Sequence, residues 1–237
     1  MKKLLLVSTI SILAAGAANA EDSIKHKGSV EGGITIDNGN TEAENYRGSL
    51  TFTSTYDIYE NIFKADGSNT KQNSVRTGEQ YNLSNQTKAS FSESDYGFIQ
   101  LEGTEDRYQG FNYRTSQLVG VGHYFVKEET LTILGELAAG ARQTDYTQNT
   151  NDEETAVGRI TGAFDWKVNE HVSIDHRTDY TIGEDNNVTE MNTGLKAFID
   201  QNLYVRLSHE LEHNSETPNS SVKNTDTRTF VTVGYEF

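Results

Sequence analysis

A possible metal-binding pattern near the C-terminus is the first group of residues that could do chemistry. Residues 209–213 read His-Glu-Leu-Glu-His, which matches the H-E-x-x-H pattern of zinc peptidases. That pattern works on a helix, where the two histidines lie one turn apart on the same face. Here it continues a strand-like alternation, and in a strand His209 and His213 are about 13 Å apart, too far to share one metal ion. We therefore predict no metal site and expect both histidines on a lipid-facing surface near an interface.

A second charged run, Asp-His-Arg-Thr-Asp at 175–179, suggests acid–base catalysis when read alone. Strand alternation places Asp175, Arg177 and Asp179 on one face and His176 on the other. Alternating charges of both signs favour an ion-pair network over a catalytic site. Since no motif resembles those of membrane-barrel phospholipases, acyltransferases or proteases, we predict no enzyme, no catalytic residue and no cofactor. A lipid-modifying enzyme with its site at the barrel rim is the least favoured alternative.

The composition excludes several other classes of protein. The chain has 237 residues, 20 Lys and Arg against 35 Asp and Glu, a net charge of −15, one Pro and no Cys. The absence of Cys rules out disulfides, Cys-ligated metals and thiol nucleophiles. The acidity argues against a nucleic-acid partner, whose binding surface would be basic. Beyond the first 20 residues no apolar run approaches the roughly 20 residues of a membrane-spanning helix.

The N-terminus has the three regions of a secretory signal peptide. Lys2 and Lys3 are basic, residues 4–13 are apolar, and Ala18-Asn19-Ala20 is a small-residue cleavage site. We expect cleavage after residue 20, which leaves residues 21–237 as the folded protein.

The remainder alternates between apolar and polar residues with a period of two, which is typical of strands with one apolar face. Near the C-terminus, Val231, Val233, Tyr235 and Phe237 alternate with Thr232, Gly234 and Glu236. Most such segments reach the roughly 9–11 residues that cross a membrane as a tilted strand. The third segment is short and poorly patterned, so ten strands is an alternative to twelve. The twelve predicted strands lie near 25–36, 44–57, 61–67, 78–91, 96–105, 113–126, 130–145, 156–168, 172–182, 189–199, 203–213 and 227–237.

The connections between these segments alternate in length. Short ones centre on 59–61, 93–95, 127–129, 169–171 and 200–202, whereas 67–75, 106–112, 146–155 and 214–226 are longer. Short periplasmic turns and longer external loops are typical of outer-membrane barrels. The sequence therefore predicts an all-β, antiparallel up-and-down transmembrane barrel, monomeric, in a Gram-negative-type outer membrane with both termini in the periplasm.

The C-terminal strand resembles the signal that the bacterial barrel assembly machinery reads, with Val231, Val233, Tyr235 and Phe237 as its alternating apolar residues. The chain as a whole resembles the YdiY-like family of uncharacterised outer-membrane proteins, often labelled salt-induced. That resemblance implies an outer-membrane barrel associated with salt response, and it supplies no catalytic or ligand residues. The segments that carry it are Gly32–Thr35, Gly39–Thr41, Arg107–Arg114, Gly120–Tyr124, Gly140–Arg142, Trp166–Lys167 and Asp226–Arg228.

The inward face of the predicted strands carries charges of both signs. A balanced interior suggests cross-strand ion pairs and a narrow or occluded lumen. The predicted lumen residues are eight acids, Glu31, Glu102, Glu136, Asp165, Asp175, Asp179, Glu210 and Glu212, and eight bases, Arg47, Arg142, Arg159, Lys167, Arg177, Lys196, Arg206 and Arg228.

These patterns predict a non-enzymatic envelope protein that forms a narrow, weakly selective channel linked to salt or osmotic stress. The alternative is an occluded structural barrel, or one that binds through its loops. The acidic loops at 149–154 and 183–187 suggest contact with lipopolysaccharide through divalent cations. The expected partners are thus outer-membrane lipid, lipopolysaccharide and the assembly machinery.

Overall fold

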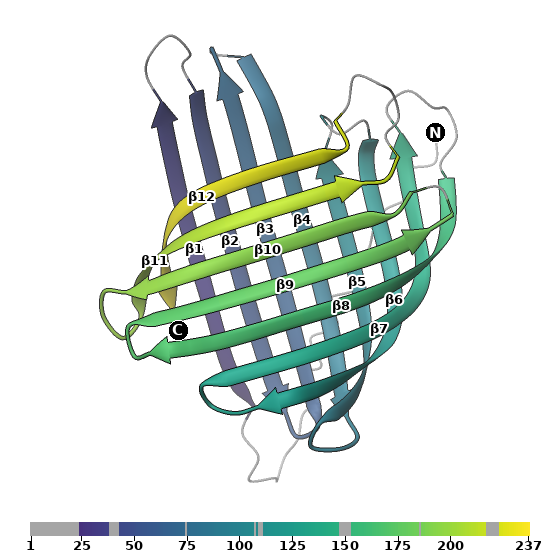
Figure 1. Cartoon of the computed structure of the whole chain (residues 1–237), viewed down its shortest axis with the longest axis vertical. Coiled ribbons are helices and arrows are strands. Elements are labelled where there is room, and N and C mark those ends of the chain that lie inside the picture. The colour runs from purple at the N-terminus through teal and green to yellow at the C-terminus, as the bar shows by residue number, and fades with distance from the viewer. Residues whose placement is uncertain are drawn as a thin grey trace.

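The computed structural model describes residues 24–37, 43–73, 75–106, 108, 111–146, 153–184, 186–216 and 223–237. The predicted signal peptide lies outside the described residues. Twelve antiparallel strands form a closed barrel in which each strand pairs with its sequence neighbours and β1 pairs with β12 (Figure 1). The strands are β1 (Lys25–Asp37), β2 (Ala43–Tyr56), β3 (Tyr59–Gln72), β4 (Val75–Ser90), β5 (Asp95–Asp106), β6 (Phe111–Lys127), β7 (Leu131–Tyr146), β8 (Glu153–Asn169), β9 (Val172–Gly183), β10 (Val188–Phe198), β11 (Leu203–Asn214) and β12 (Thr225–Glu236).

This architecture confirms the predicted fold class and strand number, and the ten-strand alternative is wrong. A search of the described residues finds no helix with the length and apolar character to cross a membrane.

The period-two pattern builds the barrel wall because successive side chains point to opposite faces of a strand. On the outer face Ile99 and Val119 are 60% and 63% exposed, whereas their inward neighbours Phe98 and Leu118 are 4% and 2% exposed. The barrel thus presents an apolar surface outward and keeps a mixed polar and aromatic core inside, as expected for a wall that contacts lipid.

One end of the barrel carries short connections, and we call it the turn end; the opposite end is the loop end. Asp57 and Ile58 alone join β2 to β3, with Asp57 in the left-handed region at φ 51°, which Asp tolerates better than most residues. In the turn before β11, the carboxylate of Asp200 accepts hydrogen bonds from the backbone N–H groups of Leu203 and Asn202 at 2.7 and 2.8 Å. These bonds hold the pKa of Asp200 below its usual range.

The predicted long loop at 67–75 is wrong. Residues 67–72 continue β3, pairing with 43–48 of β2, and β4 begins at Val75. Both faces of this stretch are polar, with the sequence Ser-Asn-Thr-Lys-Gln at 68–72, so the alternation that reveals a strand in the apolar belt is lost. Backbone pairing continues into this polar stretch, and Figure 1 shows the ends of β1–β4 standing beyond those of β9–β12.

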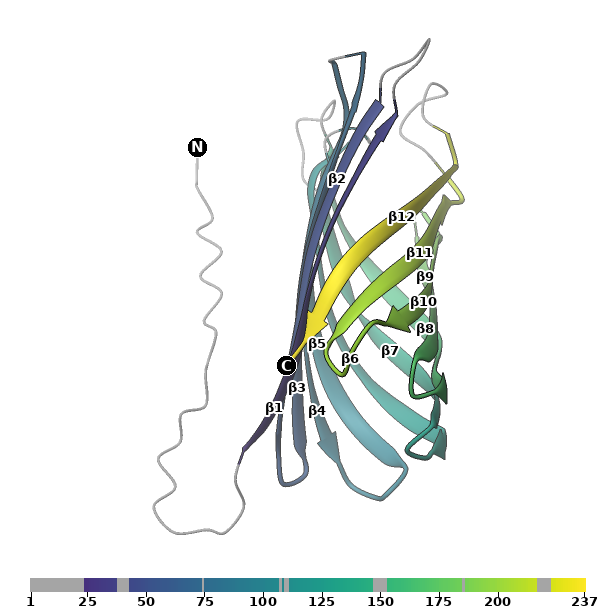
Figure 2. The ribbon, with the colours of Figure 1, turned by 90° about the vertical axis from the view of Figure 1, so that its left-hand side faces the viewer.

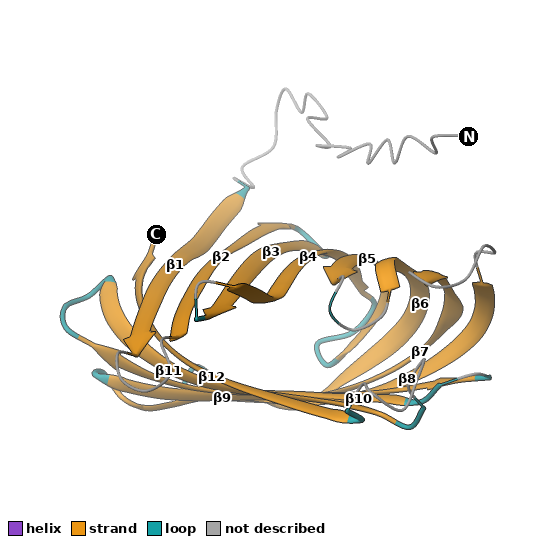
Figure 3. Ribbon diagram, turned by 90° about the horizontal axis from the view of Figure 1, so that it is seen from above, coloured by secondary structure: helices purple, strands orange, loops and turns teal. Residues whose placement is uncertain are grey.

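The seam where the barrel closes is the shortest of its strand pairings. β1 and β12 pair from Ser29–Glu236 to Gly32–Val233, while β12 pairs with β11 from Thr225 to Tyr235. Toward the loop end β1 and β12 diverge (Figure 2). Seen from above, an arched wall of β1–β6 faces a flatter wall of β7–β12 (Figure 3).

Candidate functional site

The interior of the barrel is the candidate site because charged side chains from strands that are not neighbours meet there. Arg159 of β8 reaches Glu102 of β5 through two hydrogen bonds, of 2.6 and 2.8 Å. Its Nε also donates to Thr181 at 2.9 Å, and Arg159 is only 7% exposed. A bidentate guanidinium–carboxylate pair in these surroundings is among the stronger polar contacts a protein makes.

Glu136 of β7 collects donors from three other strands. Tyr96 donates its hydroxyl at 2.8 Å, Gln86 its amide at 3.1 Å, and Arg177 a guanidinium nitrogen at 3.3 Å. Arg177 also pairs with Asp179 at 2.7 Å. Since Glu136 is 3% exposed, its charge is neutralised by these neighbours rather than by bulk water. Together with Arg159 and Glu102, this group forms the lumen network, which spans from β4 to β9.

Further pairs lie above and below the lumen network. Arg206 makes a bidentate pair with Asp175 at 2.7 and 2.9 Å, within the β9–β11 wall. Arg47 of β2 crosses to Glu210 of β11 at 2.6 Å. Other contacts of predicted lumen residues include Glu31 with Tyr204 and Thr232, Lys196 with Glu236, Arg142 with the backbone oxygen of Asn186, and Arg228 with Gln80 and with Glu212 at 3.9 Å.

Two predicted lumen residues do not take part in these pairs. Asp165 and Lys167 are exposed near the turn end of β8, where Asp165 lies opposite Asp175 in the register. Two carboxylates opposite each other repel, and the Asp175 carboxylate pairs with Arg206 of β11.

Sequence reasoning missed several inward-facing charges. Lys88 is 6% exposed, pairs with Glu60 at 3.3 Å and lies 4.8 Å from the ring centre of Tyr96. Glu190 lies opposite both Asp179 and Glu212. The same parity that places Lys196 inside places Glu190 inside, so that signal was available. Glu60 of β3 lies outside the predicted third strand at 61–67, so strand parity could not place it inside.

Aromatic rings occupy much of the remaining interior. Tyr96 and Tyr204 are 1% and 0% exposed, and each lies over a glycine of the neighbouring strand, Gly122 and Gly234 respectively. A Cβ at either glycine would overlap the ring. Glycine is therefore needed at these two positions by close approach, and the rings narrow the lumen further.

A small cavity lies inside the barrel. A cavity of about 40 Å³ lies beside the Arg159–Glu102 pair, and Gln80, Arg142 and Glu190 are among its lining residues. That volume holds a few water molecules at most, since one water needs about 10–15 Å³. Every carboxylate of the lumen network has a cationic or hydroxyl partner, so these negative charges are compensated inside the barrel.

The histidines of both charged motifs lie on the outer face. The H-E-x-x-H residues belong to strand β11, and His209 and His213 each hydrogen-bond a threonine of β12, Thr229 and Thr225, at 2.9 and 2.8 Å. His176 bonds Thr193 at 2.8 Å in the same manner. Pairing with a cross-strand hydroxyl satisfies one ring nitrogen of each histidine at a surface that is otherwise apolar.

The residues of the predicted assembly signal also lie on the outer face. Val231, Val233, Tyr235 and Phe237 are 54%, 52%, 48% and 55% exposed. Their recognition by the assembly machinery stays a prediction.

Comparison with known proteins places this geometry among outer-membrane barrels. Residues 30–237 match the family described as "Protein of unknown function, DUF481". The uncharacterized protein YdiY of Escherichia coli (strain K12) is 25% identical over 252 residues, which cover 99% of each chain. A NanC porin structure matches with a TM-score of 0.53 and 10% identity over 89% of this chain and 98% of that one. A KdgM porin structure matches with a TM-score of 0.47 and 11% identity over 90% and 99%.

Proposed function

This chain belongs to the DUF481 family of proteins of unknown function, and we propose that it acts as a narrow, weakly selective outer-membrane channel whose conductance is limited by ion pairs across its lumen. The observation that carries the proposal is the Arg159–Glu102 pair, which joins opposite walls of the barrel. We call the part of the lumen at this pair the constriction. Charges of both signs line it, so neither cations nor anions are strongly favoured.

Electrostatic screening by dissolved ions should make the width of this constriction depend on salt concentration. The Debye length falls from about 10 Å at 0.1 M salt to about 3 Å at 1 M, which weakens attraction between the more accessible partners. Glu102 and Arg177 retain 25% and 29% side-chain exposure and are therefore open to this effect. We propose that the passage widens as ionic strength rises, in keeping with the salt response that the family resemblance implies.

The same proposal includes an orientation and partners. The turn end and both termini face the periplasm, and the acidic loops face outward toward lipopolysaccharide. The C-terminal residues Val231, Val233, Tyr235 and Phe237 are read by the barrel assembly machinery, and the barrel works as a monomer without a catalytic centre. The alternation of short and longer connections supports this orientation.

A second candidate is an occluded barrel with a structural or loop-mediated role. The small residual cavity beside Arg159 favours it, since a lumen filled by side chains conducts nothing. The two functions differ in whether the lumen network opens.

Single-channel conductance of the refolded protein in a planar bilayer separates them. If the protein is a channel, we expect discrete openings whose conductance rises more steeply than that of the bulk solution between 0.1 M and 1 M KCl. A double variant, Arg159→Gln with Glu102→Gln, removes both charges of the constriction and should conduct more than the wild type. The matched control is Arg76→Gln with Glu79→Gln, an ion pair of the same types at the loop end of β4, 2.8 Å apart, which should conduct like the wild type.

The conductance results distinguish the channel from the occluded barrel. Openings in the double variant alone would support the occluded barrel. An absence of openings from both proteins, when heat-dependent gel mobility shows them folded, would contradict the channel. Strong ion selectivity in a salt gradient would contradict the balanced constriction.

A further inference from the structure

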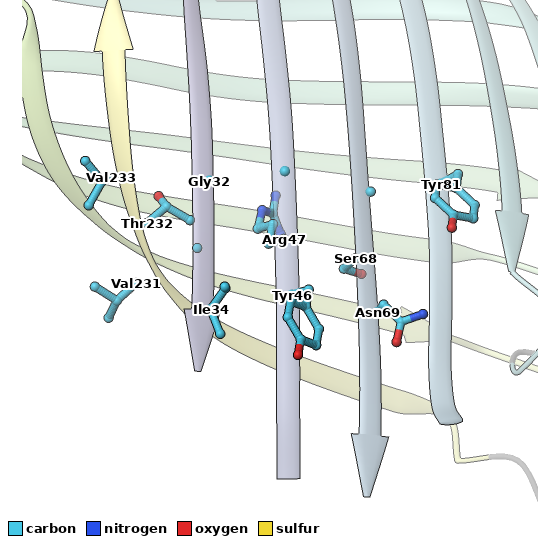
Figure 4. A pocket seen from close by; sticks show the side chains of 13 residues that line it. Gly32, Ile34, Tyr46, Arg47, Ser68, Asn69, Tyr81, Val231, Thr232 and Val233 are labelled. Carbon is cyan, nitrogen blue, oxygen red and sulfur yellow. The ribbon is translucent and has the colours of Figure 1, made fainter. Parts of the chain in front are cut away.

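A groove crosses the outer wall beside the seam, and the channel makes no use of it. Its volume is about 810 Å³, and its lining comes from β12, β1, β2, β3 and β4 (Figure 4). It begins where pairing between β1 and β12 ends in the described residues, at Gly32–Val233. We call it the seam groove.

The floor of the seam groove is formed by glycines on three adjacent strands, of which Gly67 is covered by the ring of Tyr81, whose nearest atom is 3.0 Å from where a Cβ would lie. Gly32 lies opposite Gly48, and Gly48 lies opposite Gly67, all on the outward face. A Cβ at Gly32 would meet nothing within 4 Å, and one at Gly48 would meet only a backbone oxygen at 3.9 Å. The protein's own packing therefore does not require glycine at these two positions, although glycine weakens a strand.

Large side chains stand around this floor. Ile34 and Tyr46 lie side by side on its loop-end flank, Val231 closes one end and Tyr81 the other, as Figure 4 shows. Gly162 on β8 also has open space around it, but its neighbour Gly135 is covered by the ring of Phe125. At the seam, by contrast, Gly32 and Gly48 are both open, and this pair of open glycines between bulky residues hollows the wall.

The polarity around the seam groove changes sharply along the strands. On the turn-end side the next outward row is Val30, Leu50 and Ala65, in register with one another. On the loop-end side the hydroxyl of Tyr46 donates to Glu44 at 3.1 Å, and Lys71 lies 3.7 Å from the same carboxylate. Tyrosines between an apolar belt and a charged rim mark the boundary between acyl chains and head groups.

We propose that the seam groove binds one acyl chain of an anionic phospholipid from the surrounding membrane, with the lipid head group at the rim beside Lys71. The groove is continuous with the lipid-facing wall, since Ile34, Val231 and Val233 are 63%, 54% and 52% exposed. A bound chain fills the space over the glycines and covers the point where β1 and β12 separate. A lipid also matches the change from apolar floor to charged rim.

Quenching by brominated lipid tests this proposal because the chain has a single tryptophan, Trp166, which can be replaced by Phe. In that background, one reporter is Ile34→Trp in the groove and the other is Val119→Trp on β6; both native residues are 63% exposed. The barrel is reconstituted in phosphatidylcholine vesicles with increasing fractions of phosphatidylglycerol carrying dibrominated chains.

A specific site should quench the groove reporter half-maximally at a mole fraction about fivefold or more below that of the Val119→Trp reporter, the scale of preference that polar contacts give inside membranes. Gly48→Leu fills the groove and should bring the two reporters to the same mole fraction. Gly162→Leu, another outward glycine with open space, should change neither. If Gly48→Leu does not refold, Gly32→Leu fills the same floor.

Equal half-quenching fractions for the two reporters in the otherwise unaltered barrel would show ordinary surrounding lipid only and overturn the proposal. A groove reporter shielded from quenching, together with sedimentation as a dimer, would show a second copy in the groove and also overturn it. None of these readouts depends on conductance.

Discussion

Removing one partner of the Arg159–Glu102 pair should destabilise the barrel far more than removing both. The bond is bidentate, at 2.6 and 2.8 Å, and Arg159 is 7% exposed while the Glu102 side chain is 25% exposed. Breaking a fully buried pair costs about 3–5 kcal/mol because the remaining charge is left unpaired. Since a quarter of Glu102 is open to solvent, we expect about 2–3 kcal/mol for Glu102→Gln.

The double variant tests the same reasoning by removing both charges of the pair at once. With Arg159→Gln and Glu102→Gln together, no charge is stranded and two amides can still bond. We expect a loss of about 1 kcal/mol, so the two substitutions couple by about 2 kcal/mol or more. The assay is urea unfolding in lipid vesicles, followed by the fluorescence of Trp166 on the same strand as Arg159.

The control for this cycle is the loop-end pair Arg76–Glu79, with Arg76 47% exposed. Its single and double variants should each cost less than about 1 kcal/mol. The reasoning would be refuted if Glu102→Gln cost no more than Glu79→Gln. It would also fail if the costs of the two lumen substitutions simply added, because the two side chains would then not act as a pair.

Three further predictions follow from the structure. Tyr96→Phe removes the 2.8 Å donor to buried Glu136 and should cost about 1.5–3 kcal/mol in the same unfolding assay; a cost near zero would show that water replaces the hydroxyl. Gly122→Val drives a side chain into the Tyr96 ring and should cost about 1–3 kcal/mol, and Tyr96→Ala in the same chain should recover part of that loss if the overlap is the cause. The pKa of Asp200 lies below its usual range, so its turn should add stability above the unfolded-state pKa and lose that contribution as pH falls through the folded-state value; an NMR titration giving an ordinary pKa for Asp200 would contradict this.

Much of the fold could be predicted because strand alternation is a local property. In β12 the outward set Val231, Val233 and Tyr235 and the inward set Thr232 and Gly234 can be assigned from the sequence alone. The same signal predicted twelve strands, with ten as the alternative, and the alternating connection lengths predicted their up-and-down order. The prediction failed at 67–75, where both faces of the strand are polar and local chemistry no longer distinguishes strand from loop.

The partners inside the lumen could not be derived this way. Sequence parity places Arg159 and Glu102 inside, but these residues are 57 positions apart and meet because two walls of a flattened barrel approach each other. Parity likewise placed Asp165 and Lys167 inside, and only their location near the turn end separates them from the ion pairs.

The sequence by itself therefore determined the strands whose two faces differ in polarity and the face on which the side chains of those strands lie. The tertiary structure alone decided which charges pair, how little space remains between them, and where Gly32, Gly48 and Gly67 align beside the seam. The physical reason is that alternation is set by the geometry of each strand, whereas register, closure and flattening depend on all twelve strands together.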